Sequence, residues 1–316
     1  MKRVKHPSGV DILFDAKWHQ YKLGNTALRS VSKLLDRYFP FDEANVLRHV
    51  ARKTGAPVET IKKGWARQAL LGKNVHEYIE CSLTGRPPPA FTLLLEAQGR
   101  AKQGRGEIAD ETEKKDAPEG AEKGSILHGE EGLYLPVAEA AVAAVRGGYD
   151  VLASELVVAS PEWGIAGTID LLAREKRTGR VLLADWKTTG SVSSSFRFGS
   201  FETPCTGCLR HLPNAKPYRY AMQLLIYGEI LKQQRYIESG YLDKVLRGSC
   251  NGHQVDVAPL RKELAAELEY GLVQFSKSDE GNVVVEFKKV TEKTVLPPDE
   301  HEADFVQIMQ KVMLGL

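Results

Sequence analysis

The sequence predicts an α/β protein. Near the middle of the chain, two apolar runs at residues 165–173 and 181–186 are separated by a charged turn that contains Thr178-Gly179, which is the signature of a β-hairpin. Segments on both sides of this hairpin space their apolar residues with the period of a helix. Strands and helices that alternate along one chain place it in the α/β class.

The other elements follow from periodicity and from stop signals. Helical spacing is found in seven segments, at residues 30–35, 42–53, 57–81, 135–145, 218–233, 261–273 and 302–314. Asp42 is the expected N-cap of the second helix, and the Gly- and Pro-containing run at 85–89 ends the third. Strands are expected at 151–160 and 281–290, and a short strand or hairpin within 10–23.

Length and composition bound the class of protein. The 316 residues can bury a sizeable core, and a net charge of +2 means that any binding of nucleic acid must use a local groove. No apolar run approaches the roughly 20 residues that span a bilayer, and residues 1–9 lack a signal core. Four cysteines are too few for a disulfide scaffold. We therefore expect a soluble, intracellular protein without a membrane partner; the sequence leaves its compartment open.

Each strand of the hairpin carries an acid in an apolar setting. Asp170 interrupts the first strand, and Asp185 ends the second, with Lys187 two residues further on. Alternation along a strand directs Asp185 and Lys187 to one face and Trp186 to the other. Pairing about the turn would bring the two acids together, which favours Mg²⁺ or Mn²⁺ between them, and the lysine could orient a water. The alternative is a solvent-facing ion pair at a strand end.

Two helices add polar residues at one-turn spacing. His76 and Glu80 share one face of the predicted helix at 57–81, where the alternative is a buried or capping histidine beside a solvated glutamate. Gln223 and Tyr227 are likewise four residues apart. Alone, the second pair belongs to an ordinary amphipathic helix.

In their order along the chain, these motifs resemble RecB-type nucleases of the PD-(D/E)XK superfamily. The matching pieces are Gly72-x-x-x-His76, Ile169-Asp170, Asp185-Trp186-Lys187 and Gln223-x-x-x-Tyr227. The resemblance covers roughly residues 72–231 and is nearest to the single-stranded DNA exonucleases of the mitochondrial genome maintenance type. It implies a restriction-endonuclease-like core, in which a small central mixed β-sheet is flanked by α-helices, with an N-terminal helical region.

Three parts of the chain are expected, two of them implied by the resemblance. Residues 1–95 would be the N-terminal helical region that carries the histidine motif, and residues 125–316 the nuclease core, the two forming a single catalytic domain. Residues 96–124 lose almost all apolar content and mix both charges with Gly and Pro, so we expect a flexible insertion there. This insertion departs from the family pattern.

By resemblance, the chain is a divalent-metal-dependent deoxyribonuclease. It would hydrolyse phosphodiester bonds as a monomeric exonuclease on free ends of single-stranded DNA, in DNA repair or genome maintenance. The implied catalytic residues are Asp170, Asp185 and Lys187. The implied ligands of Mg²⁺ or Mn²⁺ are His76, Asp170, Asp185 and Glu155. For Glu155, the alternative is that it is a surface residue on an edge strand. Gln223 and Tyr227 would contact the DNA.

The loop after the hairpin is the second departure from the family. Thr188, Arg197 and Phe198 are candidates for contact with DNA, because aromatics interleaved with arginine suit stacking on unpaired bases; the alternative is a loop whose phenylalanines pack on the body. Cys205, Cys208 and His211 suggest a structural Zn²⁺, with Cys250 or His253 as fourth ligand. The layout of an iron–sulfur cluster is absent. Two other functions stay open: an inactive DNA-binding relative, and a non-nuclease protein organised by zinc.

Overall fold

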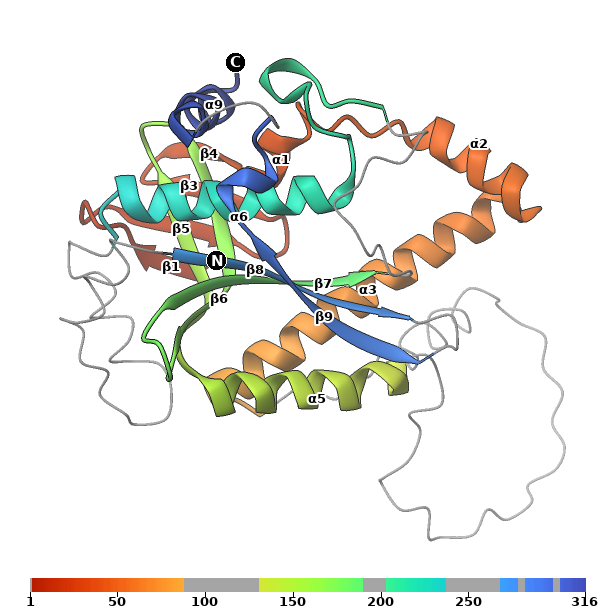
Figure 1. Cartoon of the computed structure of the whole chain (residues 1–316), viewed down its shortest axis with the longest axis horizontal. Coiled ribbons are helices and arrows are strands. Elements are labelled where there is room, and N and C mark those ends of the chain that lie inside the picture. Colours follow the sequence, from red (N-terminus) through yellow and green to blue (C-terminus); the bar gives the residue numbers. More distant parts are fainter. Residues whose placement is uncertain (1, 88–130, 190–202, 237–267, 278–281, 298–301) are drawn as a thin grey trace, which may run out of the picture.

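A computed structural model describes residues 2–87, 131–189, 203–236, 268–277, 282–297 and 302–316 (Figure 1). The α/β class is confirmed: a nine-stranded mixed sheet carries helices on both faces. The sheet is larger than the small central sheet that was expected. The difference arises because residues 2–30 contribute four strands, where the sequence predicted at most a short hairpin.

The sheet has the order β1-β2-β3-β4-β6-β7-β8-β9, and β5 pairs with the remaining edge of β6. Neighbours are antiparallel except at β4–β6 and β7–β8, which are parallel. The parallel pairs join segments that are far apart in the sequence. The strands are β1 (Lys2–Lys5), β2 (Asp11–Asp15), β3 (Gln20–Leu23), β4 (Thr26–Ser30), β5 (Tyr149–Ser160), β6 (Ile165–Glu175), β7 (Val181–Thr189), β8 (Leu268–Lys277) and β9 (Val283–Val290).

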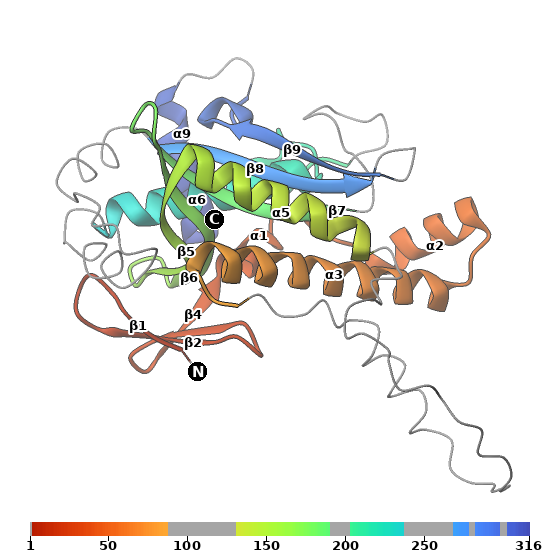
Figure 2. The same ribbon diagram turned by 90° about the horizontal axis from the view of Figure 1, so that it is seen from below.

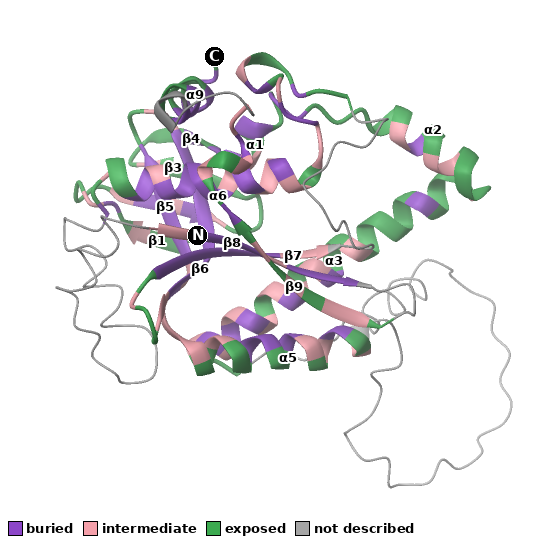
Figure 3. Cartoon of the chain, viewed as in Figure 1, coloured by how far each residue is buried: buried purple, intermediate pink, exposed green. Residues whose placement is uncertain are grey.

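Two helix layers enclose the sheet, one with α1, α6 and α9 and the other with α3 and α5 (Figure 1). Each layer buries its own apolar cluster against the central strands, as the purple ribbon of β6 shows (Figure 3). The helices are α1 (Val31–Leu35), α2 (Glu43–Thr54), α3 (Val58–Thr84), α5 (Glu131–Gly148), α6 (Lys216–Gln233) and α9 (Glu302–Leu314), with short 3-10 turns η1 (Gly207–Leu209) and η2 (Glu292–Thr294). None of these helices is long and apolar enough to cross a bilayer.

Most predicted elements are confirmed, including the N-cap at Asp42, whose carboxylate accepts from Asn45 N–H. The helix predicted at 261–273 is wrong from Leu268 onward, where β8 begins; residues 261–267 and the insertion at 96–124 lie outside the described residues. The two helix layers cover both faces of β8, with Leu272 in one apolar cluster and Phe275 in the other. A strand buried on both faces has no period-2 pattern to separate it from a helix.

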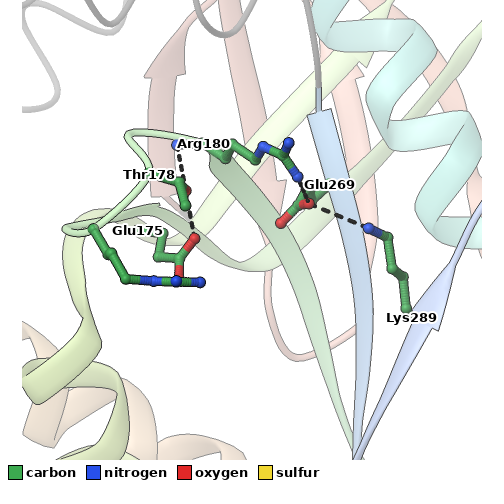
Figure 4. Close-up of polar contacts among 6 residues, drawn as sticks. Glu175, Thr178, Arg180, Glu269 and Lys289 are labelled. Carbon is green, nitrogen blue, oxygen red and sulfur yellow. Dashed lines mark hydrogen bonds and ion pairs between the residues drawn. The ribbon is translucent and has the colours of Figure 1, made fainter.

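The turn of the hairpin is closed by polar contacts (Figure 4). The hydroxyl of Thr178 donates to the Glu175 carboxylate across the turn. Beyond the turn, the carboxylate of Glu269 on β8 accepts from Arg180 at 3.0 Å and from Lys289 at 3.2 Å. These contacts fix one end of β6 and β7 to the neighbouring strands, whereas the other end of the hairpin carries the predicted acids.

Candidate active site

β6 and β7 separate where the acids lie. Their pairing runs from the turn to Leu171↔Ala184 and then stops, while β4 pairs with the same edge of β6 only at its start. The next free backbone group on β7, the N–H of Trp186, donates to Asp170 Oδ2 at 2.9 Å. A carboxylate thus replaces the backbone acceptor that a continued ladder would supply. This accounts for an acid inside an apolar strand.

Asp185 and Lys187 lie on one face of β7, as alternation predicts. Lys187 Nζ is 2.5 Å from Asp185 Oδ2 and 4.8 Å from the ring centre of Tyr220 on α6. Trp186 points to the opposite face, where its ring centre is 6.2 Å from that of Phe275. Asp185 is only 2 % exposed, and its Oδ2 makes the ion pair with Lys187 inside the protein. The ion pair is therefore buried, so the solvent-facing alternative is excluded.

His76 reaches the hairpin from α3. Its Nδ1 lies 3.5 Å from Asp170 Oδ2. The helix comes close because residue 72 is glycine: a Cβ there would lie 2.5 Å from Thr188 Oγ1. Burial, and next the charge of Lys187, lowers the pKa of His76 to about 4. At neutral pH the imidazole is uncharged, which is the form that binds metal ions.

Glu155 has an unusual backbone. It stands opposite Asp170, and its neighbours on both sides pair with β6, but Glu155 itself is missing from the ladder. Its φ is +52°, in the left-handed region that disfavours side chains by roughly 1–2 kcal/mol. Strain of this kind clusters at functional sites. Burial, and next the charge of Asp170, raises the pKa of Glu155 to about 8.

His76, Glu155 and Asp170 converge from α3, β5 and β6, and one ligand atom of each lies within 4.8 Å of the other two. No other group of three His, Cys, Asp or Glu side chains in the described part of the chain is close enough to hold a metal ion. Burial raises the pKa of Asp170, and raises that of Asp185 to about 6 against the opposing charge of Lys187. One imidazole and several carboxylates form a donor set that suits Mg²⁺ or Mn²⁺.

Gln223 and Tyr227 lie one turn apart on α6, and Gln223 Nε2 donates to Tyr227 Oη at 3.0 Å. Tyr227 is 3 % exposed, and its ring lies against Gly167, where a Cβ would come within 2.4 Å of Cε1. Tyr227 therefore positions the amide of Gln223 from within the core. Tyr220 was not among the predicted site residues. It lies three residues before Gln223 on the same face of α6, and that spacing was a usable signal.

The predicted zinc ligands have other surroundings. Cys205 is buried and its thiol donates to Pro213 O at 3.4 Å, while His211 Nε2 is 2.8 Å from Val295 O. Burial raises the pKa of Cys205 to about 12, which disfavours the thiolate that zinc requires, and raises that of Cys208 as well. Together with His211, these cysteines form no metal group within the described ranges.

The remaining candidates are four residues outside the described ranges and Glu80. Arg197 and Phe198, like the proposed fourth zinc ligands Cys250 and His253, lie outside the described residues. Glu80 lies one turn after His76 on α3, where its carboxylate contributes to the raised pKa of Glu155 and pairs with Arg86 at 2.5 Å.

The site is thus defined by residues from α3, β5, β6, β7 and α6. The family resemblance rests on the sequence motifs themselves. Neither a protein-family model nor a curated protein matches this sequence.

Proposed function

We propose that the chain is a divalent-metal-dependent deoxyribonuclease that hydrolyses phosphodiester bonds, acting as an exonuclease on free ends of single-stranded DNA. The observation that carries the proposal is the convergence of His76, Glu155 and Asp170 beside the Asp185–Lys187 pair. Buried carboxylates repel one another and pay for their desolvation, so a cation among them would remove both penalties. The strain at Glu155 supports a functional reason for keeping these groups together.

The fitting ligands for Mg²⁺ or Mn²⁺ are His76, Glu155 and Asp170, with Asp185 beside them. When bound, such an ion polarises a phosphoryl oxygen and lowers the pKa of water. The neutral imidazole of His76 adds a donor without adding charge. The hydrogen bond from Trp186 N–H holds one oxygen of Asp170 in place, so the orientation of this carboxylate is set by the backbone of β7.

Lys187 supplies the positive charge on the other side of the site. Burial alone would lower its pKa, but the carboxylates of Asp185 and Asp170 raise it, so the ammonium stays charged at neutral pH. Held between Asp185 and the Tyr220 ring, it can orient the attacking water and offset charge on the phosphate. Asp185 is a buried acid beside Lys187 and can accept the proton of that water.

Gln223 would position the substrate strand. One amide N–H is used on Tyr227, which leaves the second N–H and the carbonyl oxygen of Gln223 for a sugar or base. Because Tyr227 is buried, its contribution is to fix the rotamer of Gln223.

The test is cleavage of end-labelled single-stranded and duplex DNA with Mn²⁺, Mg²⁺ or EDTA. The variants are Asp185→Asn and Lys187→Ala, with Asp150→Asn as matched control, because Asp150 is an acid on β5 that pairs with Arg174 at 3.1 Å. We expect metal-dependent cleavage that both site variants reduce by about 10²–10⁴-fold and that Asp150→Asn retains. Cleavage that survives both site changes would refute the assignment, and DNA binding without any cleavage would identify an inactive relative.

A further inference from the structure

The helical pair formed by α2 and the first half of α3, residues 41–73, extends beyond the sheet at one end of the molecule (Figures 1 and 2). We call it the α2–α3 arm. From Val58 to Leu70 only Ile61 is buried, and the ribbon here is mostly green in Figure 3. A helix that stays exposed over three turns needs an explanation in a folded protein.

The arm concentrates positive charge. Its 33 residues contain seven Lys or Arg and three Asp or Glu, a net charge of +4, whereas the rest of the chain sums to −2. A local excess of this kind attracts a polyanion even though the protein as a whole is close to neutral.

Two aromatic rings are exposed on the same arm. Phe41 is 65 % exposed and Trp65 is 37 % exposed, and their ring centres are 6.2 Å apart with a tilt of 56°. Exposed rings beside basic side chains form a stacking platform for unpaired bases, whose faces are free. The bases of a duplex are already stacked on each other, so this chemistry selects a single strand.

The arm is in register with the candidate active site because α3 is one continuous helix. Trp65 precedes His76 by eleven residues, which at 3.6 residues per turn is close to three full turns, so the two side chains share a face about 16 Å apart. Ala69 lies between them on this face, and Gly72 marks the point where the face meets Thr188 of β7 beside the site. Lys62 and Lys73 both lie along one edge of this face. Both lysines are exposed.

We propose that the α2–α3 arm binds the single-stranded DNA that leads to the active site, with bases stacked on Phe41 and Trp65 and phosphates beside Lys62 and Lys73. The inference deepens the proposed nuclease function and rests on it for the identity of the strand. The occupant follows from the combination of charge, free aromatic faces and continuity with the site around His76.

Binding in EDTA isolates the arm from cleavage. Affinity for an oligothymidylate of about 16 nucleotides is measured for wild type and Trp65→Ala, with Trp18→Ala as matched control, because Trp18 is 65 % exposed and has the Lys17 ammonium 5.1 Å from its ring centre. We expect Trp65→Ala to weaken binding about tenfold and Trp18→Ala to leave it unchanged. Lys62→Ala and Lys73→Ala should each reduce the slope of log affinity against log salt by about 0.7.

A small chromogenic phosphodiester of thymidine, which is too short to reach the arm, separates this inference from the nuclease proposal. Trp65→Ala should cleave it with metal as fast as wild type does, while showing a raised KM for the oligonucleotide. If Trp65→Ala binds the oligonucleotide more weakly but neither wild type nor variant cleaves any substrate, the nuclease proposal is refuted and the proposed role of the α2–α3 arm stands. Equal affinities of Trp65→Ala and Trp18→Ala for the oligonucleotide would overturn the proposal that the α2–α3 arm binds single-stranded DNA. Tighter binding of RNA or duplex DNA than of single-stranded DNA would also overturn it.

Discussion

Glu155→Gln is expected to make the metal-free protein more stable while abolishing its activity. Glu155 combines a strained backbone with a half-buried carboxylate that lies next to Asp170 and has its pKa raised to about 8. Both features lower the stability of the metal-free protein. Replacement of Glu155 by a neutral side chain of the same size removes the charge and leaves the backbone unchanged, so the effect on stability isolates the electrostatic contribution.

The magnitude follows from linkage. A displacement of the carboxyl pKa from 4.5 to about 8 corresponds to on the order of 4 kcal/mol of lost stability at pH 8, at about 1.4 kcal/mol per unit. Since the folded-state pKa is the higher one, the loss is nearly absent below pH 4.5 and grows as the pH rises towards 8. The buried amide of Gln costs about 1–3 kcal/mol at either pH. We therefore expect a net gain of about 2 kcal/mol at pH 8 and none at pH 5.

The assay is urea unfolding in EDTA at pH 5 and pH 8, which reports the free energy of unfolding from the midpoint and slope. Asp150→Asn is the control on the same strand: it removes the ion pair with Arg174 and should not stabilise the protein at either pH. A Glu155→Gln protein with the same stability as wild type at both values of pH would refute the placement of a charged carboxylate inside the cluster. So would a gain that does not depend on pH.

Three further predictions concern the surroundings of the cluster. Gly167→Ala should destabilise the protein by about 1–3 kcal/mol in thermal or urea unfolding, because its Cβ would press on the Tyr227 ring, whereas Gly64→Ala, with open space around it, should stabilise α3 by about 1 kcal/mol; the opposite order would contradict the packing. Tyr227→Phe removes the acceptor of Gln223 and should raise KM for DNA by roughly 2- to 12-fold, with turnover of the chromogenic phosphodiester unchanged. Metal-dependent cleavage should fall as the pH drops through about 6, because Asp185 then takes up a proton; a pH–rate profile that is flat there would contradict this role.

Local patterns predicted the hairpin and the facing of its acids well. Alternation alone directs Asp185 and Lys187 to one side of β7, and a glycine four residues before His76 marks the close approach of α3. The ends of most helices could be predicted for the same reason, because caps such as Asp42 and Gly85 act within one turn.

Features that depend on long-range pairing could not be predicted from the sequence. The meander of β1–β4 joins the sheet through β4 and β6, whose paired residues are more than a hundred positions apart. The left-handed φ of Glu155 arises inside a strand and has no glycine to signal it. For β8, burial on both faces removed the alternation that distinguishes a strand from a helix.

The most direct test of the account is a calorimetric titration of the metal-free protein with Mn²⁺, comparing wild type with Asp170→Asn and Asp150→Asn. Asp170 is the residue that His76, Glu155 and the Trp186 N–H all approach, so its loss should remove the site. We expect wild type and Asp150→Asn to bind Mn²⁺ saturably and Asp170→Asn not to bind it. Equal binding by all three proteins, or none by wild type, would contradict it.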